Sequence, residues 1–236
     1  MSKVLEVLDL QKSFTLHEFD GKRILGCKGV SFSVDEGEFV GITGKSGSGK
    51  STMLKCLYRT YLPTSGEVWF VSERFGRIDL TRTPERQIST IRRREIGYVS
   101  QFLNVLPRVT AHDVVANSLV ETGVDEDTAH EGAAAILSHF QIPKNLWNAY
   151  PHNFSGGEKL RLNLAKEMVK QPRLLLLDEP TASLDNASKE LVKDILNELK
   201  RSGTSMVGIF HDLDFMEQTV DTHYKMNQGV LGGVTV

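Results

Sequence analysis

Residues 39–57 read FVGITGKSGSGKSTMLKCL, and this stretch decides the fold. The unbroken apolar run at 39–43 is typical of a parallel strand that is covered on both faces. Residues 44–51 match the pattern G-x-x-x-x-G-K-[ST], and residues 52–57 continue with the apolar spacing of a helix. A strand, a glycine-rich loop and a helix in this order predict a loop that wraps phosphate groups.

Each residue type in the loop has a physical role. The glycines let the backbone turn tightly and direct N–H groups at phosphate oxygens, and the helix that starts near Lys50 adds its positive end. Lys50 supplies a charge for the β- and γ-phosphates, and the Ser51 hydroxyl is a ligand for Mg²⁺. The predicted nucleoside triphosphate site comprises Gly44, Ser46, Gly47, Ser48, Gly49, Lys50, Ser51 and Thr52.

A second apolar run, Leu174–Leu177, ends in the carboxylates Asp178 and Glu179. The ends of parallel strands open onto the crevice where α/β folds bind ligands. We expect Asp178 to hold Mg²⁺ through a water, and Glu179 to point to the other side of the strand and act as general base toward the attacking water. The alternative, a strand followed by a polar turn at Glu179-Pro180, explains the two acids only generically.

The rest of the chain alternates strands and helices. We predict a half-buried strand at 30–34, a buried strand at 206–210 and a helix at 186–201 that Gly203 ends. This alternation indicates an α/β fold with a mostly parallel sheet. Between about 102 and 171 the signals are helical, with a capping box at 110–113 and a helix at 129–140. We therefore expect a single domain, 1–236, with a core lobe at 1–101 and 172–236 and a helical subdomain at about 102–171.

Composition narrows the function classes. The net charge of −2 argues against a nucleic-acid-binding protein, and the basic run Arg92–Arg94 is expected to be a solvated helix face. The two cysteines, Cys27 and Cys56, have neither metal-ligand spacing nor a disulfide framework, and Cys56 is expected to be a small buried hydrophobe. No apolar run approaches the ~18 residues that span a bilayer, and the N-terminus lacks the features of a signal peptide. We expect a cytoplasmic chain whose membrane partner, where there is one, is another chain.

The order of these motifs resembles that of the ATP-binding cassette (ABC) family over essentially the whole chain. Residues 154–158, FSGGE, resemble the family signature LSGGQ and precede the second apolar run. The resemblance implies an ABC-type P-loop NTPase domain with a mostly parallel core sheet, an antiparallel β region and an inserted helical subdomain. It also implies that ATP is hydrolysed with Mg²⁺ by a dimer, homomeric or heteromeric. The residues that it assigns to the opposite subunit's nucleotide are Ser155, Gly156, Gly157, Glu158 and Asp185.

Other positions match the family one by one. Gln101 resembles the loop glutamine that touches Mg²⁺, residues 182–185 resemble the loop that crosses the dimer interface, and His211 resembles the switch histidine at the γ-phosphate. Phe14 lies where the family stacks an aromatic ring on adenine, and Phe19 competes for that role. A lone histidine is usually structural and a lone phenylalanine usually core, but the resemblance favours function for His211 and Phe14. The expected catalytic set is Glu179, His211, Gln101 and Lys50, and the expected Mg²⁺ ligands are Ser51, Gln101 and Asp178.

The signature departs from the family pattern twice. Phe154 replaces leucine, which is a conservative apolar change, and Glu158 replaces glutamine. The negative charge of Glu158 suits the N-terminus of a helix but opposes a nearby triphosphate. We expect the backbone groups of Ser155 and Gly157 to dominate the contact.

Residues 97–116, GYVSQFLNVLPRVTAHDVVA, carry the distinction between branches of the family. Together with FSGGE they resemble the ATP-binding accessory subunits, of the PhnL type, of the phosphonate carbon–phosphorus lyase pathway. That resemblance implies a soluble enzyme complex as partner and a role in forming ribose 1-phosphonate 5-triphosphate from ATP and phosphonate. Two alternatives stay open: the ATP-binding subunit of a membrane ABC transporter, with a permease as partner, and a non-hydrolysing interaction module. The last is disfavoured because Glu179, Gln101 and His211 are all present.

Overall fold

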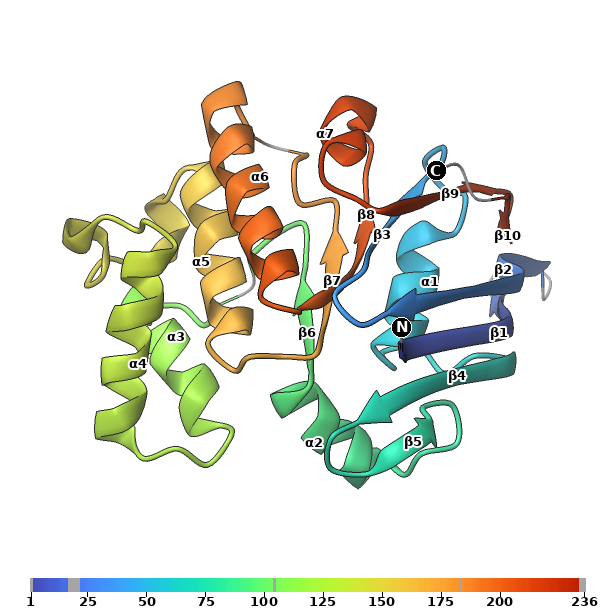
Figure 1. Ribbon diagram of the computed structural model, residues 1–236, viewed down its shortest axis with the longest axis horizontal. Helices are drawn as coiled ribbons and strands as arrows, with labels where there is room; N and C mark the ends of the chain where they lie inside the picture. The colour runs from blue at the N-terminus through green and yellow to red at the C-terminus, as the bar shows by residue number, and fades with distance from the viewer. Residues whose placement is uncertain (1, 17–21, 104, 183, 234–236) are drawn as a thin grey trace.

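The computed structural model describes residues 2–16, 22–103, 105–182 and 184–233. Its centre is a six-stranded sheet in the order β10-β9-β3-β8-β7-β6 (Figure 1). All neighbouring strands in this sheet run parallel except the pair β9 and β10. The strands are β3 (Phe39–Thr43), β6 (Ile96–Val99), β7 (Leu174–Asp178), β8 (Ser205–Ile209), β9 (Thr222–Asn227) and β10 (Val230–Leu231).

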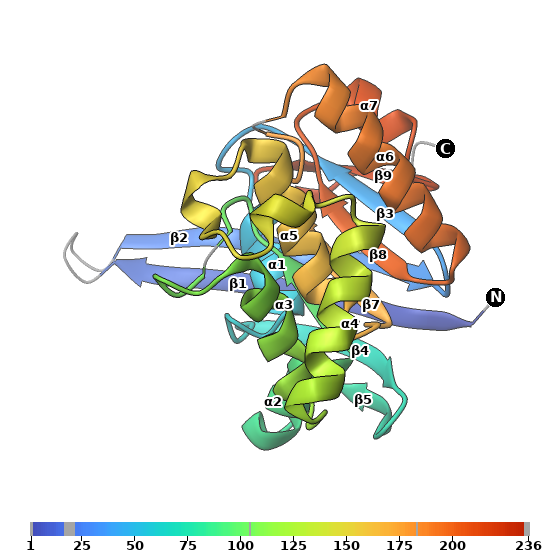
Figure 2. The same ribbon diagram turned by 90° about the vertical axis from the view of Figure 1, so that its left-hand side faces the viewer.

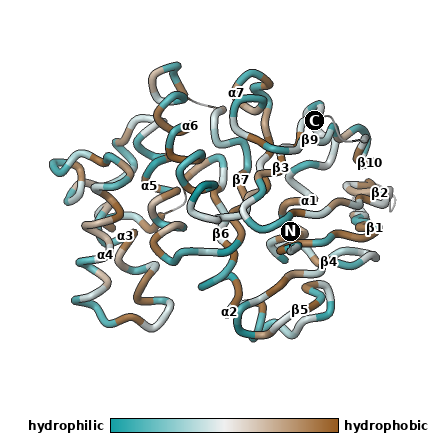
Figure 3. The backbone as a smooth tube through the Cα atoms, in the orientation of Figure 1, coloured by the Kyte–Doolittle hydropathy of each residue, from teal (hydrophilic) through white to brown (hydrophobic). Residues whose placement is uncertain are grey.

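Every residue of β3, β7 and β8 is buried, as expected of strands with both faces covered. The strand predicted at 206–210 runs one residue earlier, because Ser205 donates its N–H to the carbonyl of Arg173, the residue just before β7. The helix predicted at 186–201 is α6 (Asn186–Arg201), and Val192, Ile195, Leu196 and Leu199 are its buried residues. Hydrophilic and hydrophobic segments alternate along this helix in Figure 3.

A second sheet is antiparallel, with the strand order β2-β1-β4-β5. The strand predicted at 30–34 is only the end of β2, which pairs along most of its length with β1. The helix that follows the glycine-rich loop, α1 (Lys50–Leu57), buries Met53 and Leu54 in one apolar cluster with residues of both sheets. The strands of the second sheet are β1 (Lys3–Leu16), β2 (Lys22–Asp35), β4 (Ser65–Ser72) and β5 (Gly76–Asp79).

Helices α3, α4 and α5 stand together on the opposite side of the central sheet from the antiparallel strands (Figure 2). Residues 102–103 and 105–171 contain helices, 3-10 turns and loops, and none of these described residues lies in a strand. The helices outside α1 and α6 are α2 (Glu85–Arg94), α3 (Ala111–Val120), α4 (Glu126–His139), α5 (Gly156–Met168) and α7 (Leu213–Glu217), with 3-10 turns at Lys144–Leu146 and Pro151–Asn153.

The capping box predicted at 110–113 is only half formed. The Thr110 hydroxyl accepts the Asp113 N–H at 3.1 Å and thereby caps α3. The Asp113 carboxylate, however, accepts from the Thr110 hydroxyl at 2.7 Å and not from the Thr110 N–H. The aspartate side chain is one methylene shorter than the glutamate of a complete box.

The basic run at the end of α2 is exposed at Arg93 and Arg94, as expected of a solvated helix face, but Arg92 is partly buried. Arg92 donates from Nε to the Tyr58 carbonyl at 2.8 Å and also contacts the Arg59 carbonyl. Arg94 donates to the Thr122 carbonyl at the end of α3. The run therefore joins α2 to two neighbouring chain segments.

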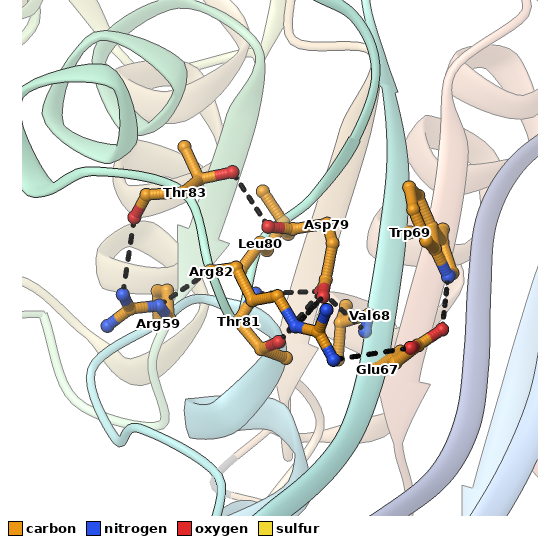
Figure 4. Close-up of polar contacts among 9 residues, drawn as sticks. All are labelled: Arg59, Glu67, Val68, Trp69, Asp79, Leu80, Thr81, Arg82 and Thr83. Carbon is orange, nitrogen blue, oxygen red and sulfur yellow. Dashed lines mark hydrogen bonds and ion pairs between the residues drawn. The ribbon is translucent and has the colours of Figure 1, made fainter.

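A polar cluster around Asp79 fixes the turn from β5 to α2 against the end of α1 (Figure 4). Asp79 accepts the Val68 N–H at 3.2 Å and the Thr81 N–H at 3.0 Å. Arg59, just after α1, donates to the Leu80 carbonyl at 2.7 Å. The antiparallel sheet is thus tied to the helix that follows the phosphate loop. Two sheets and an inserted helical block confirm the predicted α/β fold class.

Candidate functional site

The glycine-rich loop is built so that only glycine fits at its two ends. Gly44 has φ 146°, and a Cβ there would lie 2.2 Å from the Met226 carbonyl oxygen. Gly49 has φ 107°, and a Cβ there would lie 1.9 Å from the Gly26 carbonyl oxygen. The Gly229 N–H also donates to the Ser48 carbonyl at 2.8 Å. Segments far away in the sequence therefore hold the loop in its shape.

Lys50 folds back into this loop. Its Nζ donates to the Gly44 carbonyl at 2.7 Å and to the Lys45 carbonyl at 3.1 Å. Burial lowers the pKa of Lys50, while the charges of Glu179 and Asp178 act in the opposite direction. The Ser48 hydroxyl is buried without a hydrogen-bond partner among the described residues. A cradle with a central ammonium group and a spare buried hydroxyl fits the phosphate chain of a nucleotide.

Asp178 lies at the end of β7, directly beside the loop. The Ser51 hydroxyl donates to Asp178 Oδ1 at 3.0 Å, and the Tyr98 hydroxyl donates to Asp178 Oδ2 at 2.8 Å. Burial, and next the Asp178 charge, raises the pKa of Tyr98, so this phenol stays a donor. A hydroxyl and a carboxylate are hard oxygen ligands that suit Mg²⁺. Sequence reasoning missed Tyr98, because nothing local to β6 shows that it faces Asp178.

We had expected Glu179 to lie in the strand, but β7 ends one residue earlier, at Asp178. Its φ of 55° is in the left-handed region, which costs a non-glycine residue roughly 1–2 kcal/mol. Such strain is characteristic of functional sites. The turn directs Glu179 Oε1 to within 2.7 Å of His211 Nε2, so two of the four residues predicted to be catalytic are hydrogen-bonded. Asp178 and Glu179 face different partners.

A cavity of about 320 Å³ joins these groups. The loop from Ser46 to Thr52 lines it, together with Glu179 and the ring of Phe14. Phe14 is partly buried, contacts the Tyr61 ring edge-on at 5.3 Å between centroids, and has the Lys12 ammonium 4.9 Å from its centre. Phe14 is thus on the same cavity as the loop. Phe19, its competitor, lies outside the described residues.

Gln101 and one residue of the signature segment, Gly156, line a second cavity, of about 500 Å³. Gln101, Gly156 and Glu179 all contribute to its wall. Glu179 therefore lines both cavities, whereas Lys50 lines only the first. Within one chain, the structure brings the loop, Asp178, Glu179 and His211 together, and the signature segment lies apart from the loop.

Ser155 and Glu158 form a complete capping box at the start of α5. The Glu158 N–H donates to Ser155 Oγ at 3.3 Å, and the Ser155 N–H donates to Glu158 Oε2 at 2.8 Å. We missed this role, although the spacing S-x-x-E at 155–158 is its sequence signal. The glutamate that departs from the family signature thus stabilises the helix end locally.

The start of α6 is capped by Asp185 and packs against Gly157 of α5. Asp185 caps α6 by accepting the Ser188 N–H at 2.7 Å, and this bond lowers the pKa of its carboxyl. A Cβ on Gly157 would lie 2.5 Å from Ser188 Oγ, so the signature helix packs directly on the start of α6. The carboxylate of Asp185 is accordingly engaged within its own chain.

Comparisons with known proteins show the family of the chain. The ABC transporter family model matches residues 27–182. The chain is 33% identical to the lipoprotein-releasing system ATP-binding protein LolD of Aquifex aeolicus, covering 100% of this chain and 99% of that protein. It is 30% identical to the methionine import ATP-binding protein MetN of Haemophilus influenzae, covering 95% of this chain and 64% of that protein.

A solved structure gives the same result. The dimeric structure of a post-hydrolysis state of the ATP-binding cassette MJ0796, bound to ADP and Pi, superposes with a TM-score of 0.88 at 27% identity and covers 98% of this chain and 97% of that one. Among the described residues, no helix is long and apolar enough to cross a membrane. The chain belongs to the ABC transporter family as an ATPase domain that binds ATP with Mg²⁺.

Proposed function

We propose that this chain is the ATP-hydrolysing subunit of a membrane ABC transporter and that it works as a dimer. The observation that carries the proposal is the position of Glu179, which is hydrogen-bonded to His211, follows Asp178 directly and lines the loop cavity. By name, the LolD and MetN relatives are ATP-binding proteins of a lipoprotein-releasing system and of methionine import, which supports the transporter alternative. These relatives give no support to the phosphonate carbon–phosphorus lyase complex that the sequence led us to prefer.

In the proposed reaction, water attacks the γ-phosphorus of ATP while the bond to the β–γ bridging oxygen breaks. Glu179 Oε accepts a proton from the attacking water, and the products are ADP and inorganic phosphate. His211 holds Glu179 from one side at 2.7 Å and thereby fixes the direction of its carboxylate. Such a base contributes roughly 10²–10⁴-fold to the rate.

Lys50 binds the phosphate chain, and this would replace its bonds to the Gly44 and Lys45 carbonyls. Ser51 and Asp178 would hold Mg²⁺, with Gln101 as a further ligand, and the ion would supply positive charge at the phosphates. Phe14, on the wall of the same cavity, would stack on the base. In this proposal, Phe14 is the site's recognition element for adenine.

The second half of the site would come from another copy of the chain or from a related ATPase. Lys50 and Gly156 of the signature segment line different cavities of one chain, so a single chain does not enclose the triphosphate between them. We propose that residues 155–158 of the second subunit contact the γ-phosphate and that the 182–185 loop lies at the interface. The dimeric state of the similar MJ0796 structure supports this arrangement. Nucleotide binding then appears as dimer affinity.

Two measurements test the proposal. Phosphate release from Mg-ATP by the purified chain, lost in Lys50→Ala, would support the enzymatic part. Capture of the native complex from detergent-solubilised cells and, in parallel, from detergent-free lysate tests the partner. An integral membrane permease at the cytoplasmic face is the expected partner, and recovery of a complex of soluble enzymes alone would support the carbon–phosphorus lyase prediction instead.

A further inference from the structure

Two histidines and an aspartate meet between α3 and α4, outside both cavities of the ATPase site. His112 and Asp113 are in the first turn of α3, and His130 is in the first half of α4. One potential ligand atom from each of the three residues lies within 4.8 Å of the others. No role in ATP hydrolysis accounts for this cluster, because none of its members lines the loop cavity or the signature cavity.

The two imidazoles present their nitrogens to each other. His112 Nδ1 and His130 Nδ1 are 3.2 Å apart, whereas the ring centroids are 5.0 Å apart with the planes 21° from parallel. Because the nitrogens are so much closer than the centres, they must lie on the facing edges of the two rings. Two zinc–nitrogen bonds of about 2.0–2.1 Å at a tetrahedral angle place their nitrogens roughly 3.3 Å apart. The observed separation therefore suits two ligands of one tetrahedral ion.

The surroundings orient His112 as a ligand. Its Nε2 lies 3.1 Å from the His130 carbonyl oxygen, an acceptor that favours the proton on Nε2 and leaves the lone pair on Nδ1. The Trp147 ring, nearly parallel at 15°, packs beside the His112 ring. Metal-binding histidines ordinarily donate their second ring N–H to such a carbonyl, and ligating carboxylates are themselves hydrogen-bonded. Asp113 meets this second condition through the Thr110 hydroxyl at 2.7 Å.

We propose that His112, His130 and Asp113 form a binding site for a divalent transition-metal ion of the zinc type, which joins α3 to α4. Two imidazoles and a carboxylate are the ligand types that zinc takes, and a water would complete the tetrahedron. Asp113 offers a carboxylate oxygen within 4.8 Å of a nitrogen of each histidine, and its side chain would turn toward the ion to bind it. The site is separate from the Mg²⁺ ligands, which are oxygen atoms alone.

The test is a titration of the full chain, without a polyhistidine tag and without nucleotide, with Co²⁺ followed by visible absorption and by displacement with Zn²⁺. We expect one equivalent of Co²⁺ to bind with the intense absorption of a tetrahedral complex. His130→Ala and Asp113→Asn should each weaken binding by at least about tenfold. His139→Ala is the matched control, because His139 is on the same helix and outside the cluster, and it should bind as the wild type does.

The melting temperature supplies an independent readout. Zn²⁺ should raise it for the wild type and for His139→Ala, and leave it unchanged for His130→Ala, because an ion that binds only the folded chain stabilises it. His130 is exposed, so its replacement is not expected to unfold the protein. Equal Co²⁺ affinity in wild type, His130→Ala and Asp113→Asn would overturn the proposal. So would the absence of a tetrahedral spectrum from the wild type, which would leave the histidines as a hydrogen-bonded pair.

Discussion

The phosphate loop and the signature segment differ in what holds them. Loop residues 44–51 are fixed by carbonyls of Gly26 and Met226 and by the bond from Ser51 to Asp178, all distant in sequence. The signature segment is held by its own first turn, through the reciprocal bonds between Ser155 and Glu158. The loop is thus shaped by segments distant in sequence, whereas the first turn of the signature helix is closed by bonds among its own residues, and Gly157 packs that turn on Ser188 of α6.

This difference bears on how the two halves meet nucleotide. The loop already has the shape that the phosphate groups of a nucleotide need, so nucleotide binding there costs the loop little conformational entropy. The start of α5 already uses the Ser155 hydroxyl and N–H and the Glu158 N–H within the capping box. A γ-phosphate that approaches from another subunit must therefore compete with the box or use the remaining N–H groups of the turn. Binding at the loop is expected to come first and engagement of the signature second.

The largest effect is expected for Glu179→Gln, which tests both halves of the proposed site. We expect hydrolysis to fall about 10²–10⁴-fold, because the amide cannot accept the proton of the attacking water. ATP binding should persist and a closed dimer should accumulate, seen as an earlier elution from a sizing column in the presence of Mg-ATP. Hydrolysis at the wild-type rate would contradict the role of Glu179, and a monomer with bound ATP would contradict the role of the signature.

Gly49→Ala tests whether distant carbonyls shape the loop. Its Cβ would lie 1.9 Å from the Gly26 oxygen at a φ of 107°, so we expect a loss of about 2–5 kcal/mol in the free energy of unfolding. Gly47→Ala is the control, because no atom lies within 4 Å of its Cβ and only the left-handed φ of 75° is costly, at about 1–2 kcal/mol. Urea denaturation of both variants measures the difference in their free energies of unfolding. Equal losses would show that the backbone at Gly26 moves away from the added Cβ at little cost.

Lys50→Ala removes the charged donor from the centre of the loop. ATP affinity should fall about 10- to 100-fold, because charged hydrogen bonds contribute about 1.5–3 kcal/mol each. Fluorescent-nucleotide titration measures the affinity, and Lys45→Ala is the control because only its carbonyl contacts Lys50. An unchanged ATP affinity in Lys50→Ala would show that the phosphates do not bind at this loop.

The smallest effect is expected for Glu158→Gln, which tests how the charge of the signature segment affects ATP-driven dimerisation. Glutamine still completes a capping box, but it removes the charge that would face the triphosphate. We expect ATP-driven dimerisation to strengthen about two- to fivefold, the equivalent of roughly 0.3–1 kcal/mol for an exposed charge. Analytical sedimentation of chains that also carry Glu179→Gln, in which hydrolysis is slow, measures this dimerisation. Glu158→Ala, which also loses the box, separates the charge from the cap, and weaker dimerisation of Glu158→Gln would show that the charge assists the contact.

Features with local sequence signals were predictable. The loop, the buried run at 174–177 and the helix at 186–201 appear in the structure where their own spacing places them, to within a residue. The 14-residue strands β1 and β2 were mostly missed, because their pairing with each other and not their composition extends them.

The site divides in the same way. Lys50, Ser51, Asp178 and Glu179 follow from motifs, but the hydroxyl of Tyr98 and the carbonyls of Gly26 and Met226 join the site only through tertiary packing. The left-handed turn at Glu179, which brings it to His211, has no sequence signal either, because glutamate rarely adopts that conformation. The branch of the family that we propose rests on the relatives and not on residues 97–116.

The contacts of the phosphate loop with Met226 and Gly229 also bear on when, during synthesis of the chain, the loop takes its shape. The ribosome makes residues 44–51 early, yet the β9–β10 hairpin that closes over them is made about 180 residues later, at the end of the folded core. We therefore expect a growing or stalled chain to capture no ATP until the β9–β10 hairpin has been made and has docked against the loop.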